Sequence, residues 1–390
     1  MSDLHRFQRG HPMPTTSSCD DHSIDFIAHF SNLRDPRQEV KLVYPLPEIL
    51  LLTLCAVLSG ADSWVAISAY GSKKRALLRR FLPFLDGTPS HDQLGNIFSA
   101  LDAQAFQACF IDWAASLNSA LTGVVAIDGK TSRRSLDKAG GKGAIHMISA
   151  WSSELNLVLG QRQVDGKSNE ITAIPELLEL LALKGAIVTI DAMGCQRGIS
   201  AKIISKEADY ILALKGNQGS LREDTEVFMK EQVEAGFTNT TVTCHESVEK
   251  LHGRIETRKV TVCSDIEWLK ARHYWPGLES IIMVEYRAVV QNKTRDETRF
   301  YISSMTSDAR FQAKAIRDHW GIENGLHWVM DMVFRDDECR IRKGNAPANF
   351  ATIKHSASNI LRSVKGKHSL RTKRHIAAWD DDFLAEIIGT

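Results

Sequence analysis

The sequence lacks any closely spaced pair of cysteines. Its seven cysteines are scattered over 390 residues, and no two of them form a C-x-x-C motif. Disulfide frameworks and structural zinc sites are built from such pairs, so this pattern argues against a stapled extracellular fold and against a zinc knot. It is typical of a protein in a reducing compartment, and we expect a cytoplasmic location.

Long apolar segments are also missing. The most apolar run lies within Glu48–Gly60 and holds about ten consecutive apolar residues, whereas a membrane-spanning helix needs about 20. The first 24 residues are polar and lack the apolar core of a signal peptide. We expect a buried helix at the apolar run, a flexible tail over residues 1–24, and no membrane partner.

No excess of either charge is present, because the formal net charge is only +1. The distribution is uneven: the segment from Arg335 to Arg374 contains eleven Lys or Arg against three acidic residues, and Ser72–Arg80 is a second basic cluster. Contacts with DNA phosphates require such local patches, although a charged run is also typical of a solvated surface. Residues 363–390 are predicted to form a basic tail that contacts phosphates without reading sequence.

The order of apolar patterns predicts a helical region followed by an α/β region. Residues 25–121 carry apolar side chains at helical spacing, and Ser90 with Gln93 fits a capping box. From Gly123 the pattern changes to β-β-β-α-β-α-β, which predicts an α/β unit with a mixed sheet. Strand-like segments then dominate to about Ser303, and two long helices follow. The helical region is either a DNA-binding module or a packing domain.

A possible nucleotide-binding loop lies at Gly129-Lys130-Thr131, which matches the end of a P-loop motif. The P-loop needs a further glycine at position 124, where Val124 stands, and its backbone wraps phosphates through glycine-rich turns. The β-branched residues before Asp128 predict a strand instead. We therefore set the P-loop aside.

Two apolar strands end in an aspartate. "VVAID" ends at Asp128 and "AIVTID" ends at Asp191. Ligands of α/β proteins bind at the carboxyl ends of the strands, so Asp128 and Asp191 are candidate neighbours in one site, although a turn after each strand would also explain them. Two adjacent carboxylates favour a divalent cation, and Mg²⁺ prefers such oxygen ligands.

A third acid is expected from the helix that follows Ser307. His319, Glu323, His327 and Asp331 recur there at steps of four and form one stripe. The stripe could be a mixed His/carboxylate metal face, but ligands over three helical turns cannot all reach one ion, so Glu323 alone is the more economical choice. Asp331, Asp336 and Asp337 are its rivals, and a helix with packed His and solvated acids is the alternative without a site.

The chain resembles the DDE transposases of bacterial insertion sequences, in particular the ISAs-type group that includes the H-repeat-associated proteins. The resemblance is carried, in order, by "VVAIDGKTSRRS", "TIDAMGCQ", "LALKGNQ", "HGRIETR", "YISS" and "IRDHWGIENGLHWVMDMVFRDDECRIR". It implies an RNase H-like catalytic domain over residues 122–362 with a β-rich insertion at about 221–303, after a helical N-terminal domain. It also implies that Asp128, Asp191 and Glu323 are the catalytic, metal-holding triad.

The activity implied is two-metal phosphoryl transfer on double-stranded DNA. Two Mg²⁺ ions about 3.5 to 4 Å apart, replaceable by Mn²⁺, would cut the element ends and join their 3′-OH to target DNA, in a homo-oligomer that pairs two ends. In the broader group of related transposases, the Glu lies in a helical signature that also contains Tyr, Arg and Lys. Ile316, His319 and Met330 stand at those three positions here, so DNA contacts must come from other residues. The candidates are Lys130, Lys215, Arg254, Arg258 and Arg317. A relative that no longer catalyses, and a nuclease without strand transfer, stay open as alternatives.

Overall fold

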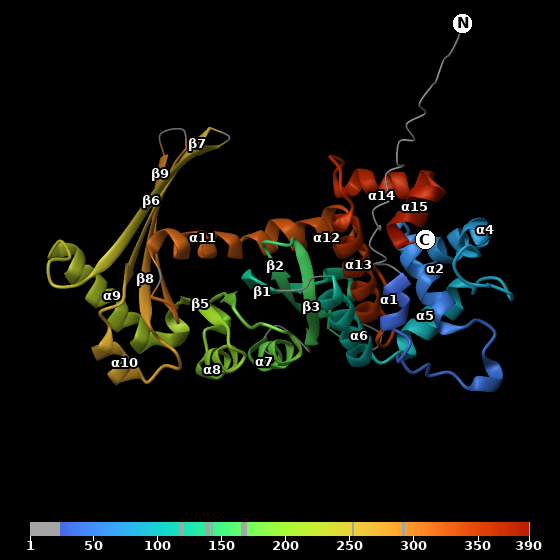
Figure 1. Cartoon of the computed structure of the whole chain (residues 1–390), viewed down its shortest axis with the longest axis horizontal. Coiled ribbons are helices and arrows are strands. Elements are labelled where there is room, and N and C mark those ends of the chain that lie inside the picture. The colour runs from blue at the N-terminus through green and yellow to red at the C-terminus, as the bar shows by residue number, and fades with distance from the viewer. Residues whose placement is uncertain are drawn as a thin grey trace, which may run out of the picture.

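The computed structural model describes residues 24–117, 121–136, 141, 143–164, 170–251, 253–290, 293–306 and 308–389. The chain is drawn out along one axis, with N- and C-terminal helices at one end, a sheet in the middle and a long β ribbon at the other end (Figure 1). The predicted flexible tail over residues 1–24 lies outside the described residues apart from Ile24, which begins the first helix.

The N-terminal region is helical, as its apolar spacing predicts. Ser90 caps α5 with Gln93 in the expected capping box, and Asp102 caps α6 after a break at Leu101. No described helix has the length and apolar character needed to cross a membrane. The helices are α1 (Ile24–His29), α2 (Leu46–Leu58), α3 (Trp64–Lys73), α4 (Arg75–Leu78), α5 (His91–Ala100) and α6 (Ala103–Ser116).

The middle of the molecule has the predicted β-β-β-α-β-α-β order. β1 pairs with β2 antiparallel and with β4 parallel, and β4 pairs with β5 parallel. The whole nine-stranded sheet has the order β3-β2-β1-β4-β5-β9-β8-β7-β6. Its first strands and the helices between them are β1 (Gly123–Thr131), β2 (His146–Ser152), β3 (Leu157–Val164), α7 (Glu170–Leu180), β4 (Ala186–Ile190), α8 (Arg197–Ser205) and β5 (Asp209–Leu214).

The predicted β-rich insertion is partly helical. Its first part is α9 (Gly219–Glu234), which buries Leu221, Thr225 and Met229 at four-residue spacing. This spacing is the helical period, which the prediction of strands overlooked. The later strands continue the same sheet, because β9 pairs with β5. They are β6 (Val242–Leu251), β7 (Arg254–Cys263), β8 (Ser280–Val290) and β9 (Lys293–Ser303), with α10 (Glu267–His273) between β7 and β8.

Two helical segments after the sheet lead back to the N-terminal end. α11 (Ala309–His319), the π-helical turn η6 (Glu323–His327) and α12 (Trp328–Met332) cross the sheet, and α13 (Ala346–Ser363) follows. α13 is buried along most of its length and packs against α2, α5, α6 and β3. It joins the N-terminal helices to the sheet, together with α6, which packs directly against β3.

The predicted basic tail at residues 363–390 contains two helices instead, α14 (Leu370–Trp379) and α15 (Asp381–Ile388), which pack against α2. Two of its basic side chains are buried. Arg374 donates to the carbonyl oxygen of Val57 at 2.8 Å and to Asp62 at 2.6 Å. Lys373 donates to the carbonyl oxygens of Leu361 and Val364 at the C-terminal end of α13. These cations satisfy helix C-termini, so they are not available for phosphates.

Edge strand β3 is closed by a side chain of α13. Asn359 accepts a hydrogen bond from the backbone N–H of Val158 at 2.9 Å and donates one to its carbonyl oxygen at 2.8 Å. The amide thus replaces a neighbouring strand at a buried position and protects an edge that would otherwise offer unpaired backbone groups.

We expect Asn359→Leu to lower the free energy of unfolding by about 2–5 kcal/mol, because each buried backbone group left without a partner costs about 1–3 kcal/mol. Urea unfolding followed by circular dichroism measures this change. The control Asn239→Leu alters an exposed asparagine and should change the free energy by less than about 0.5 kcal/mol. Equal stabilities of the two variants would contradict the role of Asn359.

Candidate active site

The site is built on the parallel pairing of β1 and β4. Ile127 lies opposite Ile190 in this register, so Asp128 and Asp191 are the next residues on neighbouring strands. Asp191 follows the end of β4 as predicted, whereas β1 does not end at Asp128 but continues to Thr131, paired with β2. The residues before each aspartate are buried, which is typical of parallel strands covered on both faces. The predicted proximity of the two acids therefore follows from the strand pairing.

Asp191 also begins the short 3-10 helix η4 (Ala192–Gly194). Its Oδ1 accepts hydrogen bonds from the backbone N–H groups of Met193 at 3.0 Å and Gly194 at 3.4 Å. These contacts fix the carboxylate where the strand ends, while the residue as a whole stays exposed.

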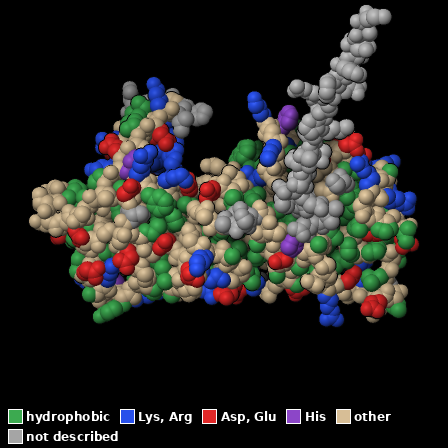
Figure 2. Space-filling model, viewed as in Figure 1, with side chains coloured by type: hydrophobic (Ala, Val, Ile, Leu, Met, Phe, Trp, Pro, Cys, Tyr) green, Lys and Arg blue, Asp and Glu red, His purple; other side chains and the backbone are tan. Residues whose placement is uncertain are grey.

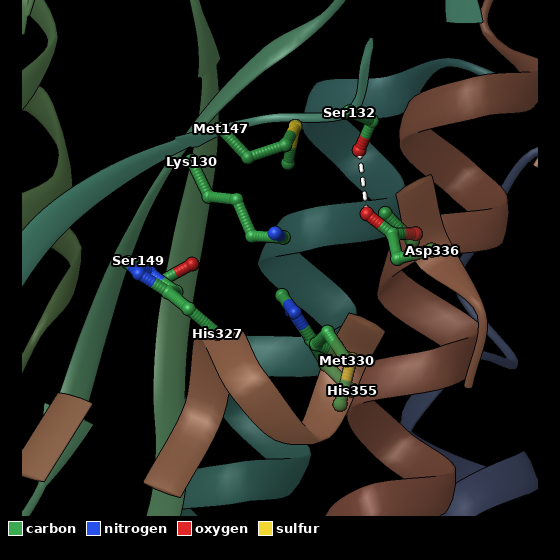
Figure 3. Close-up of a pocket in the computed structure, with 9 residues that line it drawn as sticks. Lys130, Ser132, Met147, Ser149, His327, Met330, Asp336 and His355 are labelled. Atoms are coloured by element: carbon green, nitrogen blue, oxygen red, sulfur yellow. Dashed lines mark hydrogen bonds between the residues drawn. The ribbon is translucent and has the colours of Figure 1, made fainter. Parts of the chain in front are cut away.

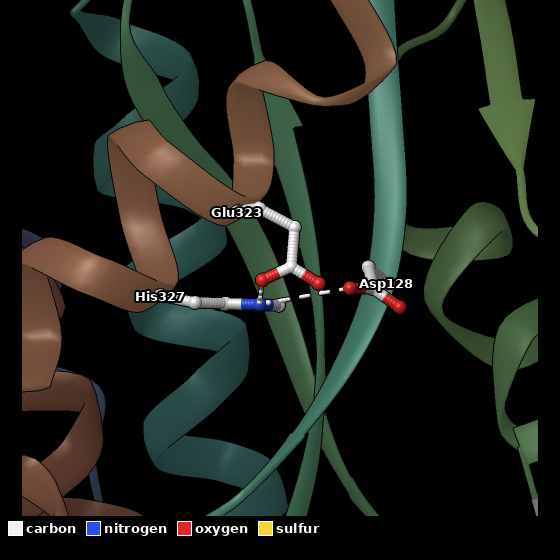
Figure 4. A group of neighbouring side chains, drawn as sticks. All are labelled: Asp128, Glu323 and His327. Atoms are coloured by element: carbon white, nitrogen blue, oxygen red, sulfur yellow. Dashed lines mark ion pairs between the residues drawn. The ribbon is translucent and has the colours of Figure 1, made fainter. Parts of the chain in front are cut away.

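Glu323 and His327 face Asp128 from the helix above the sheet (Figure 4). Nδ1 of His327 lies 3.6 Å from Oδ2 of Asp128 and 3.4 Å from Oε2 of Glu323. One ligand atom from each of the three residues falls within 4.8 Å of the other two. Among the described residues, this is the group that has the spacing of a metal site, and Asp191 lies outside it.

The chemistry of Asp128 is altered by this setting. Burial raises its pKa to about 7, the N–H of Gly129 opposes this, and the negative charges of Glu323 and Asp191 add to the increase. A carboxyl group whose pKa is raised by burial and by nearby negative charges is frequent at functional sites. Burial lowers the pKa of His327, which favours its neutral form.

An open groove of about 570 Å³ runs beside these residues. Its walls come from the end of β1, from η6 and from the start of α12. The lining residues include Lys130, Arg133, His146, Glu323, His327 and Trp328. An extended polymer bound in this groove would contact the carboxylate of Glu323.

A second, small cavity of about 10 Å³ lies behind His327 (Figure 3). It is lined by Lys130, Ser132, Ser149, Asp336 and His355 among others. Within the described part of the chain, neither Nε2 of His327 nor Nδ1 of His355 has a hydrogen-bond partner. A volume of this size admits about one water molecule.

The rival third acids are held by other partners. Asp331 pairs with Lys130 at 2.7 Å. Asp336 is buried, accepts from Ser132 at 2.6 Å and pairs with Lys354 at 2.9 Å. Burial opposes ionisation of Asp336, but the charge of Lys354 and these hydrogen bonds lower its pKa to about 2. Asp337 lies 3.7 Å from Nε of Arg133. Of the candidates, Glu323 is the acid that faces Asp128.

A buried His–Glu pair supports the strand beside Asp128. Nε2 of His146 lies 2.6 Å from Glu170, and its Nδ1 lies 2.8 Å from the hydroxyl of Thr131. A Cβ at Gly129 would lie only 2.4 Å from His146 Nε2, so glycine is required for this close approach. Sequence reasoning missed this pair, because the two residues belong to separate elements without a shared motif.

The five predicted DNA-binding residues are in different environments. Lys215 is exposed after β5, at the same sheet edge as the two aspartates. Arg254 and Arg258 on β7 both pair with Glu256, and Arg317 on α11 pairs with Glu249 at 2.6 Å. Lys130 is largely buried beside Asp331. The side chains of Arg254 and Arg317 remain about half exposed, at 52% and 49%.

Comparisons with known proteins agree with this architecture. The family described as "Transposase DDE domain" matches residues 98–360, and the family "DDE_Tnp_1-associated" matches residues 27–114. The chain is 42% identical to the H repeat-associated putative transposase YhhI of Escherichia coli (strain K12), over 92% of this chain and 96% of that protein. It is 41% identical to the putative transposase YncI of Escherichia coli O157:H7, over 93% and 94%. Among solved structures, it is similar to a piggyBac transposase synaptic complex with hairpin DNA (TM-score 0.44, 10% identity, 94% and 78% covered).

The mixed sheet, the helical region before it and the match to the DDE domain agree with the RNase H-like fold that the resemblance implies. The chain belongs to the family of DDE transposases, since the family matches most of its length and close relatives align almost end to end. It is thus an insertion-sequence transposase, an enzyme that cuts and joins DNA. The DDE domain implies the use of a divalent metal.

Buried His355 makes the stability depend on pH. Burial lowers its pKa to about 4, whereas an unfolded histidine has a pKa of about 6.5. Because the folded-state value is the lower one, His355 contributes stability that is complete above pH ~6.5 and is lost as the pH falls toward ~4. We expect this contribution to be about 3 kcal/mol.

Urea unfolding between pH 7 and pH 4 measures the contribution of His355 to the free energy of unfolding. His355→Gln should remove part of the loss of stability that the wild-type protein shows on acidification. The control His91→Gln changes an exposed histidine and should leave the pH dependence as it is. Parallel curves for wild type and His355→Gln would contradict the assignment.

Proposed function

We propose that the protein cuts the ends of its element and joins their 3′-OH groups to target DNA, with Asp128, Asp191 and Glu323 as the catalytic acids. The observation that carries this proposal is the register of β1 and β4, which puts Asp128 beside Asp191 at a sheet edge that Glu323 faces. We further propose that the enzyme acts in the cytoplasm and assembles as a homo-oligomer on paired ends.

The donor set fits divalent cations. Carboxylate oxygens gather here without a compensating Lys or Arg paired to Asp128, Asp191 or Glu323 among the described ion pairs. Like-charged groups at this spacing are stabilised by a cation. Asp128, Asp191 and Glu323 would hold Mg²⁺, or Mn²⁺ in its place, and the bound ions would supply activation of the attacking hydroxyl and stabilisation of the leaving oxygen.

The side chains of the protein then have distinct tasks. The backbone contacts of Asp191 hold its carboxylate in one orientation. The groove between β1 and η6 receives the DNA strand, and His146 with Glu170 supports the strand that carries Asp128. Positioning of this kind brings the attacking oxygen and the phosphate together.

The shape of the molecule supports a path for duplex DNA. Its outline is hollowed between the β6–β7 ribbon and the C-terminal helices, with α11 and α12 between them (Figures 1 and 2). Lys and Arg side chains gather on the ribbon (Figure 2). Arg254 and Arg258 on the ribbon, Arg317 on α11 and Lys215 after β5 are proposed to contact DNA phosphates, and Lys130 is proposed to act beside the carboxylates.

Loss of one acid should abolish both chemical steps. We expect Asp128→Asn, Asp191→Asn and Glu323→Gln each to lower cleavage and strand transfer by more than about 10³-fold, because each removes a carboxylate from the cation site. The assay uses the purified protein, the DNA that flanks its gene, and Mg²⁺. The control Glu207→Gln changes an exposed glutamate and should keep wild-type activity.

A strand-transfer assay with a pre-cut 3′-OH end separates the alternatives. Joining of this end to a plasmid supports the transposase, cutting without joining supports a nuclease, and binding without either supports a relative that no longer catalyses. Cleavage by Asp191→Asn at the wild-type rate would show that the acid is wrongly assigned.

Lys215 should contribute a phosphate contact. We expect Lys215→Gln to reduce the slope of log K against log[salt] for duplex DNA by about 1, since each neutralised phosphate releases about one counterion. Fluorescence anisotropy at several salt concentrations measures the slope. The matched control is Lys184→Gln, which alters an exposed lysine before β4. It lies at the N-terminal ends of the parallel strands, away from the aspartates. An unchanged slope in Lys215→Gln would place the DNA elsewhere.

A further inference from the structure

We propose that His327 is a metal ligand through Nδ1, so that the centre at Asp128 and Glu323 is a mixed nitrogen and oxygen site. This inference deepens the proposed function, which requires a cation at these carboxylates. It adds a histidine that the acidic triad does not include.

The distances suit a shared ion. Metal–ligand bonds of about 2.1 Å with angles between 90° and 110° separate two ligand atoms by about 3.0–3.5 Å. Nδ1 of His327 lies 3.4 Å from Oε2 of Glu323 and 3.6 Å from Oδ2 of Asp128. The nitrogen is therefore nearer the spacing of a co-ligand than that of a direct hydrogen bond, which has a usual N···O distance of about 2.9 Å.

The ring is held in this orientation by burial. The side chain of His327 is only 9% exposed, and its ring points between the two carboxylates (Figure 4). Glu323, in contrast, is 52% exposed. A buried imidazole cannot swing away into solvent, so the least mobile donor of the three is the nitrogen.

The far side of the ring can carry the proton that a ligand histidine needs. If Nδ1 binds the ion, the hydrogen must lie on Nε2 and needs an acceptor. His327 lines the small cavity of about 10 Å³ together with Ser149, Asp336 and His355, and its Nε2 is buried without a partner among the described residues. One water in that cavity would accept the Nε2 hydrogen and donate to Nδ1 of His355, which lacks a partner among the described residues. Such support fixes the tautomer with the Nδ1 lone pair toward the carboxylates.

The helical positions of Glu323 and His327 explain why both side chains reach one point, because residues four apart lie on the same face of a helix. Glu323 begins η6 and His327 ends it, so the pair spans the widened turn. Single π turns in α-helices are frequent at functional sites. The turn faces β1, where Asp128 lies, so three ligands come from two elements without requiring several helical turns to converge.

A nitrogen ligand changes the preference among metals. Mg²⁺ takes oxygen ligands almost exclusively, whereas imidazole suits later transition metals, and Mn²⁺ accepts both. We therefore expect Mn²⁺ to bind this centre more tightly than Mg²⁺, and the difference to depend on His327.

The test uses the full-length protein with Mn²⁺ alone and no DNA. Pulsed electron paramagnetic resonance should detect coupling of bound Mn²⁺ to one imidazole ¹⁴N in the wild type. His327→Gln should lose the coupling and weaken Mn²⁺ binding at least tenfold in titration calorimetry, because loss of mere outer-shell partners already costs about 10–100-fold. Mg²⁺ binding should weaken less than Mn²⁺ binding.

His319→Gln is the matched control, because His319 contacts Thr189 on the strand that ends at Asp191. This variant should keep the coupling. Bound Mn²⁺ without ¹⁴N coupling in the folded wild type, or coupling that persists in His327→Gln, would overturn the proposal. The wild-type spectrum decides even if a variant fails to fold.

The outcome is separable from the proposed function. Coupling with no DNA cleavage would leave the ligand assignment intact and contradict the catalytic proposal. Cleavage that depends on Asp128, Asp191 and Glu323 in a protein without coupling would do the reverse.

Discussion

The parallel hydrogen bonding between β1 and β4 is the constraint on which the site depends. A shift of one residue in this register would turn every side chain of β4 to the other face of the sheet. The residues of β4 and the first part of β1 are buried on both faces of the sheet, so such a shift would disrupt the packing on both sides. The hydrophobic core therefore sets the relative positions of Asp128 and Asp191, although neither acid contributes to it.

A second constraint is a buried ion pair that connects α13 to the segment after α12 and to the end of β1. Lys354 of α13 pairs with Asp336, which also accepts from Ser132 after β1. Both charges are buried, so the pair adds little net stability, but losing one partner would leave an unpaired charge at a cost of about 3–5 kcal/mol. The contact thus specifies how the segment after α12 meets the end of β1. This geometry determines where η6, and with it Glu323, lies above Asp128.

Much of the fold follows from sequence patterns, and the failures have physical causes. Continuous β-branched runs and capping residues such as Ser90 identified the strands and helix starts, because these signals are local. Residues 363–390 were expected to be a tail, since Lys and Arg are usually solvated. Arg374 instead donates to the C-terminus of α2, a partner more than 300 residues away in the chain. No local pattern reports such a pairing.

The candidate site was also predictable only in part. Asp128 and Asp191 were predictable, because parallel strands end at one edge. His327 was named but set aside, since a regular α-helix does not bring a stripe of four residues to one ion. Glu323 and His327, however, are only four residues apart and share one face of the helix, across the π turn. A local change of helix type depends on packing against β1, and spacing alone does not reveal it.

The distribution of ion pairs reconciles a net charge of +1 with DNA binding. Exposed ion pairs are worth about 0–1 kcal/mol, so a phosphate can replace the carboxylate partner at small cost. Arg317 and Arg254 are about half exposed and meet this condition. Glu256 is nearly buried, and Arg258, which is 26% exposed, also pairs with it.

If both arginines left Glu256, a buried carboxylate would lose its cations, so one of them must stay. Arg258 is the better anchor, because it is the more buried of the two and also stacks on Tyr286. Arg254 is then free to turn to a phosphate without exposing the charge of Glu256. Within one ion-pair cluster, burial thus separates Arg258, which must keep its bond to Glu256 when it contacts DNA, from Arg254, which can turn fully to a phosphate.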